Sequence, residues 1–119
     1  IKNTPSGDCD VVHFILAGKP FYAISAGPYF KFSEAVSIMV HCKTQKEIDY
    51  YWKKLSADPK SEQCGWLKDK FGLSWQIVPT LMEKIYQSKD DKKLERVTQA
   101  FLKMKKFDLA VLQEAAKGK

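Results

Sequence analysis

Residues 64–79 read CGWLKDKFGLSWQIVP, two short apolar runs on either side of an Asp-x-x-Gly turn. Asp69 can start such a turn and Gly72 can adopt the positive φ that closes it, so the stretch predicts two paired strands. Gln76 lies in the middle of the second run, where a strand that only supports the core would rarely carry an amide. The stretch therefore predicts both a hairpin and a polar group on one of its faces.

Upstream of this stretch, three more runs predict strands, at residues 11–17, 21–26 and 35–42. Thr44 and Glu47 form a capping box, in which each side chain accepts a backbone N–H at the start of a helix. The helix that follows should bury a stripe with helical spacing: Ile48, Tyr51, Trp52 and Leu55.

After Pro79 the apolar period changes from two to 3.6, which predicts a helical tail. Thr80 and Glu83 form a second capping box, and a last helix should begin after Asp108 and end near Gly118. The inward positions of the tail are Leu81, Ile85, Leu94, Val97, Phe101, Met104, Leu109 and Leu112. This order predicts an α+β fold in which a mostly antiparallel sheet carries helices on one face.

Length and composition fit one domain over residues 1–119, 45% of them hydrophobic. Of the 20 basic residues only Arg96 is Arg, and sites that read bases favour Arg, so no nucleic-acid partner is expected despite the net charge of +6. No apolar run approaches the roughly 20 residues that cross a bilayer, so no membrane partner is expected either. Three separated cysteines without a Cys-x-x-Cys pair fit reduced thiols in the cytoplasm.

Alternation sorts each strand into two faces, one apolar and one that mixes small and polar residues. Ser25, Ser37 and Gln76 recur on the mixed faces of three strands, which is typical of a ligand pocket, although each alone could simply meet water. His13 and His41 also lie on strands, where a lone His is more often a packed or surface residue than a ligand. No catalytic residue can be assigned, so whether the chain is an enzyme stays open.

Three segments together resemble the PhnB-like branch of the vicinal-oxygen-chelate superfamily, which contains glyoxalases, bleomycin-resistance proteins and extradiol dioxygenases: GPYFKFSEAVSIMVHC (27–42), IDYYWKKLS (48–56) and CGWLKDKFGLSWQIVP (64–79). Members of this branch are often labelled 3-demethylubiquinone-9 3-methyltransferase. The resemblance extends from about Asp10 into the helical tail. It implies βαβββ modules that form a cupped pseudo-barrel, usually in a homodimer.

On this resemblance, residues 10–26 are the end of an incomplete first module, 33–79 are a complete second module with a weak strand near Ser61, and 80–119 are the tail. Metal-using members place ligands where this chain has Ser25, Ser37 and Gln76. Hydroxyls and a neutral amide are poor ligands for a divalent ion, so no metal and no cofactor are expected. The resemblance implies a pocket for an unidentified small molecule, with Tyr22, Ser25, Ser37, Trp66 and Gln76 as candidate lining residues.

Two alternatives remain open. One is a metal-dependent enzyme of the glyoxalase or dioxygenase type that recruits His13, His41 or a residue of the missing opening segment of the first module as ligands. The other is a dimeric interaction protein whose cup is filled by its own side chains, with no cavity above about 300 Å³ between the sheets. The methyltransferase label finds no support in the sequence, because there is no Gly-rich loop between a strand and a helix for a methyl-donor nucleotide.

Overall fold

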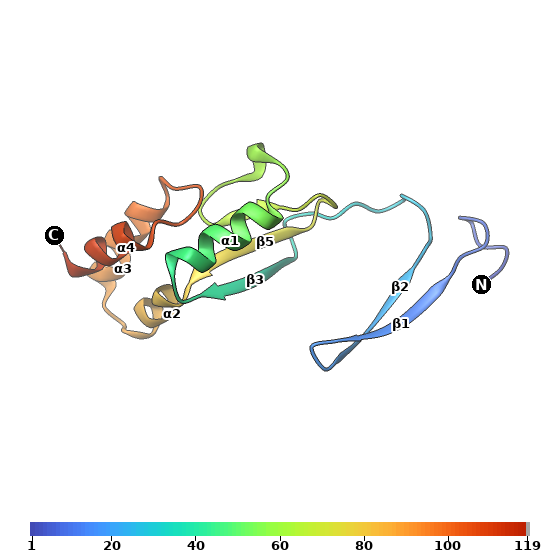
Figure 1. The fold of residues 1–119 in the computed structure, drawn as a ribbon, viewed down its shortest axis with the longest axis horizontal. Coiled ribbons are helices and arrows are strands. Elements are labelled where there is room, and N and C mark those ends of the chain that lie inside the picture. The colour runs from blue at the N-terminus through green and yellow to red at the C-terminus, as the bar shows by residue number, and fades with distance from the viewer. Residues whose placement is uncertain (119) are drawn as a thin grey trace. The chain divides into compact units, whose positions relative to one another are not determined.

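The computed structural model describes residues 1–118 and confirms the α+β class (Figure 1). Its elements in chain order are β1 (Val11–Leu16), β2 (Lys19–Ile24), β3 (Ser37–Cys42), α1 (Gln45–Leu55), a 3₁₀ turn (Pro59–Ser61), β4 (Trp66–Lys68), β5 (Ser74–Pro79), α2 (Thr80–Gln87), α3 (Asp91–Phe101) and α4 (Leu109–Lys117). The contacts divide the chain into two compact units, Ile1–Lys31 and Phe32–Lys119. That these units form a single domain stays a prediction.

The first unit contains the predicted hairpin, in which β1 and β2 pair antiparallel from Val11 opposite Ile24 to Leu16 opposite Lys19. Its turn lies at Ala17 and Gly18, with φ of 50° and 75°, one residue earlier than the sequence indicated. Two consecutive residues with positive φ suit the right-handed twist of a tight hairpin, so the second strand can start at Lys19. Every residue of both strands is exposed within this unit.

The second unit is built on a three-stranded sheet in the order β3-β5-β4. β4 pairs antiparallel with β5, as the turn at Asp69 and Gly72 predicts, and Gly72 has a φ of 83°. β3 pairs with β5 in parallel, so the sheet is mixed rather than mostly antiparallel. Parallel strands need a long crossover connection, and the segment that carries α1 supplies it.

The weak strand predicted near Ser61 is wrong. Pro59 starts a 3₁₀ turn there, capped by Asp58, whose side chain accepts from the backbone N–H of Lys60 at 3.1 Å. Proline fixes φ near the helical value and lacks an N–H for a strand ladder, which explains the preference for a turn. Strand pairing in this region is limited to a single bridge between Gln63 and Trp66.

α1 lies across one face of the sheet, as Figure 1 shows. Thr44 Oγ1 accepts from the backbone N–H of Glu47 at 3.2 Å, which confirms the predicted start of the helix. The predicted stripe also holds: Ile48 and Trp52 are buried, and Tyr51 and Leu55 pack around them. They contact Cys42, Leu67 and Ile77 from the sheet and form the first hydrophobic core.

The tail forms a second core around Met82, Ile85, Val97, Phe107 and Leu112. Of the other predicted inward positions, four pack around this core, Leu81, Leu94, Phe101 and Met104, and Leu109 is partly buried. The capping box predicted at Thr80 is wrong: β5 runs directly into α2, so Thr80 is already helical, and the N-cap is Pro79 without a side-chain hydrogen bond. The predicted start at Asp108 and end at Gly118 are confirmed for α4. Among residues 1–118, no helix is both long and apolar enough to cross a bilayer.

Candidate ligand-binding site

The face of the three-stranded sheet opposite α1, called the open face below, carries the mixed set of residues that alternation predicts. Strand register aligns these residues in rows that run across the sheet. One row is Ser37, Ser74 and Lys68, and the next is Met39, Gln76 and Trp66. A third row continues with His41 and Val78. The first row, with two hydroxyls and an ammonium group, is therefore the most polar, and the rows after it carry more apolar side chains.

The main cleft, of about 490 Å³, lies over the second and third rows. Trp66, Gln76, Met39 and His41 line it from the sheet, and tail residues complete it: Met82, Glu83, Tyr86, Phe101 and Phe107. A mostly apolar cleft with a few polar groups and this volume is typical of small-molecule sites.

Gln76 is held in place by a hydrogen bond across the sheet. Its Nε2 donates to Ser37 Oγ at 2.9 Å, and both side chains are partly buried. The amide then presents Oε1 as an acceptor, and the Ser37 hydroxyl keeps its own proton to donate. The pair thus offers one acceptor and one donor in fixed positions on the open face.

The side cleft, of about 500 Å³, lies over the first row and shares Cys64 and Trp66 with the main cleft. Lys68 Nζ pairs there with Glu34 Oε1 at 2.5 Å. The hydrogen bond from Lys68 is the main reason that the pKa of Glu34 lies below its ordinary value. Ser74 is only 1% exposed, and its Oγ has no hydrogen-bond partner within residues 1–118. A buried hydroxyl left without a partner costs about 1–3 kcal/mol.

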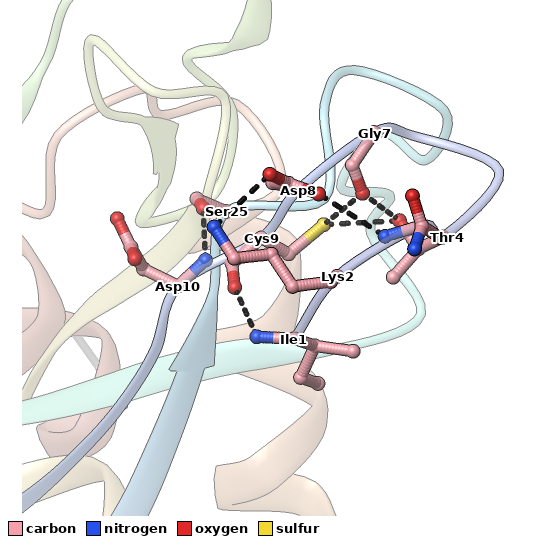
Figure 2. Close-up of polar contacts among 9 residues, drawn as sticks. Ile1, Lys2, Thr4, Gly7, Asp8, Cys9, Asp10 and Ser25 are labelled. Atoms are coloured by element: carbon pink, nitrogen blue, oxygen red, sulfur yellow. Dashed lines mark hydrogen bonds and ion pairs between the residues drawn. The ribbon is translucent and has the colours of Figure 1, made fainter.

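Of the five predicted pocket residues, Trp66 and Gln76 line the main cleft, and Ser37 bonds to Gln76 without lining either cleft. Tyr22 and Ser25 belong to the first unit, so their place beside the cleft stays a prediction. Figure 2 shows Ser25 within the polar network that closes the hairpin, where its Oγ accepts from the backbone N–H of Asp10 at 2.9 Å. In the same network the N-terminal amine of Ile1 donates to the Cys9 carbonyl at 2.8 Å.

The side chains of the open face do not fit a divalent metal. Ser37 and Gln76 supply a hydroxyl and an amide that already bond to each other, and neither carries the charge or imidazole that such an ion prefers. His41 lines the main cleft, whereas His13 lies in the hairpin of the first unit, with its ring 4.8 Å from that of Tyr22. Within residues 1–118 no three His, Cys, Asp or Glu residues gather in a possible metal site.

Sequence reasoning missed the residues that give the clefts their walls. Alternation through β4 could have placed Lys68 beside Trp66, since residues two apart share a face. Nothing in the sequence could have placed Phe101 and Phe107 there, because only tertiary packing brings the tail to the sheet. That packing includes backbone bonds from Cys64 N to the Met104 carbonyl and from Gly65 N to the Lys105 carbonyl, each 2.8 Å.

The fold and the cleft together define a class of protein, a small α+β module with a cleft on one face of its sheet. β3, α1, β4 and β5 are consistent with a βαβββ module in which the 3₁₀ turn at Pro59–Ser61 replaces the strand after the helix. One face of the sheet carries a helix, and the other carries a cleft of small-molecule size. A family model described as 3-demethylubiquinone-9 3-methyltransferase matches residues 1–78, and the chain therefore belongs to this PhnB-like family with the glyoxalase-type fold. No curated protein matches the chain. The family match ends within β5, so it leaves out the tail that walls the main cleft.

Proposed function

We propose that the protein binds a small organic molecule in the main cleft, with Trp66 as the apolar contact and Gln76 as the polar one. The observation that carries this proposal is that Gln76, which lines a 490 Å³ cleft, is held by a hydrogen bond from its Nε2 to Ser37 Oγ on the neighbouring strand. A bond between two side chains 39 residues apart fixes the orientation of an amide that core packing alone does not require. Fixed polar groups in an apolar cleft are what orient a ligand.

No metal is part of this proposal. The groups that Ser37 and Gln76 could offer to a metal are neutral, and they already bond to each other. We therefore assign the cleft residues to binding and orienting the ligand, and derive no reaction step from a metal.

The methyltransferase description of the family is a separate hypothesis for this chain. Binding of a methyl-donor nucleotide usually relies on a Gly-rich loop between a strand and a helix. The junction between β3 and α1 reads Cys42-Lys43-Thr44 and contains no glycine. We propose that S-adenosylmethionine is not the ligand of the main cleft.

A thermal-shift screen of the full chain tests the proposal. A fragment that binds at one hundred times its dissociation constant stabilises the folded state by about 2.7 kcal/mol, which raises the melting temperature by several degrees. Gln76→Met should abolish the shift, whereas Trp75→Phe, on the opposite face of the same strand, should retain it. Equal loss in both variants, or a shift with S-adenosylmethionine that depends on Gln76, would contradict the proposal.

We also propose that the protein is a homodimer. The hairpin of the first unit supports this, because a two-stranded hairpin is marginally stable by itself and its apolar side chains are exposed within that unit. Examples are Tyr22 at 74% and Ile15 at 61% exposure. Sedimentation velocity at micromolar concentration should give a mass of twice 13.6 kDa, and a monomer at all concentrations would refute this proposal.

A further inference from the structure

We infer that the side cleft binds an oxyanion, a carboxylate or a phosphate, that belongs to the same ligand whose apolar body lies in the main cleft. This inference rests on the proposed binding function and adds the chemical class of the ligand. The two clefts share Trp66 and Cys64 in their walls, so they adjoin at these residues. One molecule can therefore occupy both.

The first row of the open face supplies the groups that an oxyanion needs. Lys68 provides a positive charge, and its side chain is 25% exposed, so water screens it less than a fully exposed lysine. Ser74, which lines the side cleft, provides a hydroxyl with no partner in residues 1–118. Lys60 also lines the side cleft. Hydrogen bonds from such donors to a charged oxygen are stronger than those to a neutral one.

The ion pair between Glu34 and Lys68 shows that a carboxylate can bind at this position. The Glu34 side chain is 65% exposed, yet its Oε1 lies 2.5 Å from Lys68 Nζ. A carboxylate attached to an exposed side chain is a weak competitor, since exposed ion pairs contribute about 0–1 kcal/mol. We therefore expect a ligand oxyanion to displace Glu34 and to take its place on Lys68.

The spacing of the rows sets the size of the ligand. Successive rows on one face are two residues apart, which is roughly 7 Å along a strand. A ligand with an anionic group about 7 Å from the middle of an aromatic or branched apolar body can thus contact Lys68 and Trp66 together. The tail side chains Phe101 and Phe107 then enclose the far end of that body.

The test compares acids with their uncharged counterparts on the full chain. The probes are naphthalene-2-carboxylate, 4-phenylbutanoate and indole-3-acetate, each with its primary amide, and 2-naphthyl phosphate, with dissociation constants measured by calorimetry. The acids should bind about tenfold or more tightly than the amides, because a charge-assisted bond replaces a neutral one. The phosphate distinguishes which oxyanion the row prefers.

Three variants and one control locate the effect. Lys68→Met should weaken the acids about tenfold and leave the amides unchanged, whereas the control Lys70→Met, which removes the same charge from an exposed turn position, should change neither. Glu34→Gln should tighten the acids several-fold, since the competing carboxylate is gone. Ser74→Ala should weaken the acids without lowering the melting temperature, because the hydroxyl it removes is buried without a partner in residues 1–118.

The outcomes separate the two proposals. Acid and amide that bind equally in the main cleft would overturn the oxyanion inference and leave the binding function standing. Failure of every probe to bind would count against the cleft itself, and against the oxyanion inference with it. A loss of acid binding in Lys70→Met equal to that in Lys68→Met would show that the net charge of the chain is responsible, and would overturn the assignment of the side cleft.

Discussion

Gly65 is the position where one added methyl group should report most clearly on how the hairpin of β4 and β5 meets the tail. Its φ is 82°, and a Cβ built there lies 2.7 Å from Phe107 Cε2, 3.0 Å from Phe107 Cζ and 3.2 Å from the Ile77 carbonyl oxygen. Carbon atoms in contact prefer about 3.5–4.0 Å, so the ring would have to move by about 1 Å. Phe107 is only 4% exposed and belongs to the second core, so moving its ring would disturb that packing.

Gly72 is the matched control, because its φ is 83° and nothing lies within 4 Å of its added Cβ. Gly72→Ala incurs the left-handed backbone cost of about 1–2 kcal/mol, partly offset by about 0.4–1 kcal/mol from the stiffer unfolded chain. Gly65→Ala incurs both of these and also overpacking against Phe107, about 1–3 kcal/mol. The shared costs cancel in the difference, so Gly65→Ala should be about 1–3 kcal/mol less stable than Gly72→Ala.

Urea unfolding followed by tryptophan fluorescence measures this difference, since Trp52, Trp66 and Trp75 all lie in the second unit. Phe107→Leu removes the ring atoms that clash, so adding it to Gly65→Ala should recover about 1 kcal/mol or more relative to the sum of the two single changes. Equal destabilisation by Gly65→Ala and Gly72→Ala, or strict additivity with Phe107→Leu, would refute the close packing of the tail on the hairpin.

Three further outcomes are expected. Burial acts to raise the pKa of Asp69, but hydrogen bonds from the Trp75 indole at 2.9 Å and from backbone N–H groups outweigh it and leave the pKa below its ordinary value. The carboxylate thus stabilises the fold above about pH 4, and this stabilisation is lost as the pH falls through the folded pKa. In urea unfolding, Asp69→Asn should therefore be about 1–2 kcal/mol less stable than the unchanged chain at pH 7 and equally stable in acid. A loss of stability that is the same at both pH values would refute this role of Asp69. Gln45→Ala should lower the free energy of unfolding by about 1–3 kcal/mol, because Gln45 Oε1 accepts from Leu109 N at 2.7 Å and Nε2 donates to the Phe107 carbonyl at 3.0 Å. Gln113→Ala, at an exposed position, is the control and should leave the stability unchanged. Iodoacetamide should alkylate Cys64 before Cys42, because burial and the charge of Glu47 raise the pKa of the Cys42 thiol. Peptide mapping that finds the reverse order would contradict the burial of Cys42.

The local parts of the fold could be predicted from the sequence because local chemistry dictates them. Asp69 and Gly72 define their turn, Thr44 defines the start of α1, and alternation places Ser37 and Gln76 on the face away from the helix. Thr80 shows the limit of this reasoning. A capping pattern was present there, but β5 enters α2 without an intervening residue, and the pattern could not show that.

The walls of the site could not be predicted, for a physical reason. Parallel pairing of β3 with β5 and docking of the tail depend on contacts between residues far apart in the chain. The Gln45 side chain, for example, reaches 64 residues along the chain to the start of α4. Lys68 is different: its face follows from alternation, but its importance becomes visible only when Ser37 and Ser74 are aligned beside it.

The most direct test of the binding site is the ¹⁵N–¹H spectrum of the indole groups during titration with a fragment that shifts the melting temperature. The chain has three tryptophans, and two provide internal controls: Trp52 Nε1 donates to Glu62 and Trp75 Nε1 donates to Asp69, both beside α1 rather than on the open face. Trp66 lines both clefts. We predict that the Trp66 indole signal moves with saturation while those of Trp52 and Trp75 stay in place. A ligand that moves Trp52 or Trp75 and leaves Trp66 unchanged would contradict the assignment of the open face as the binding site.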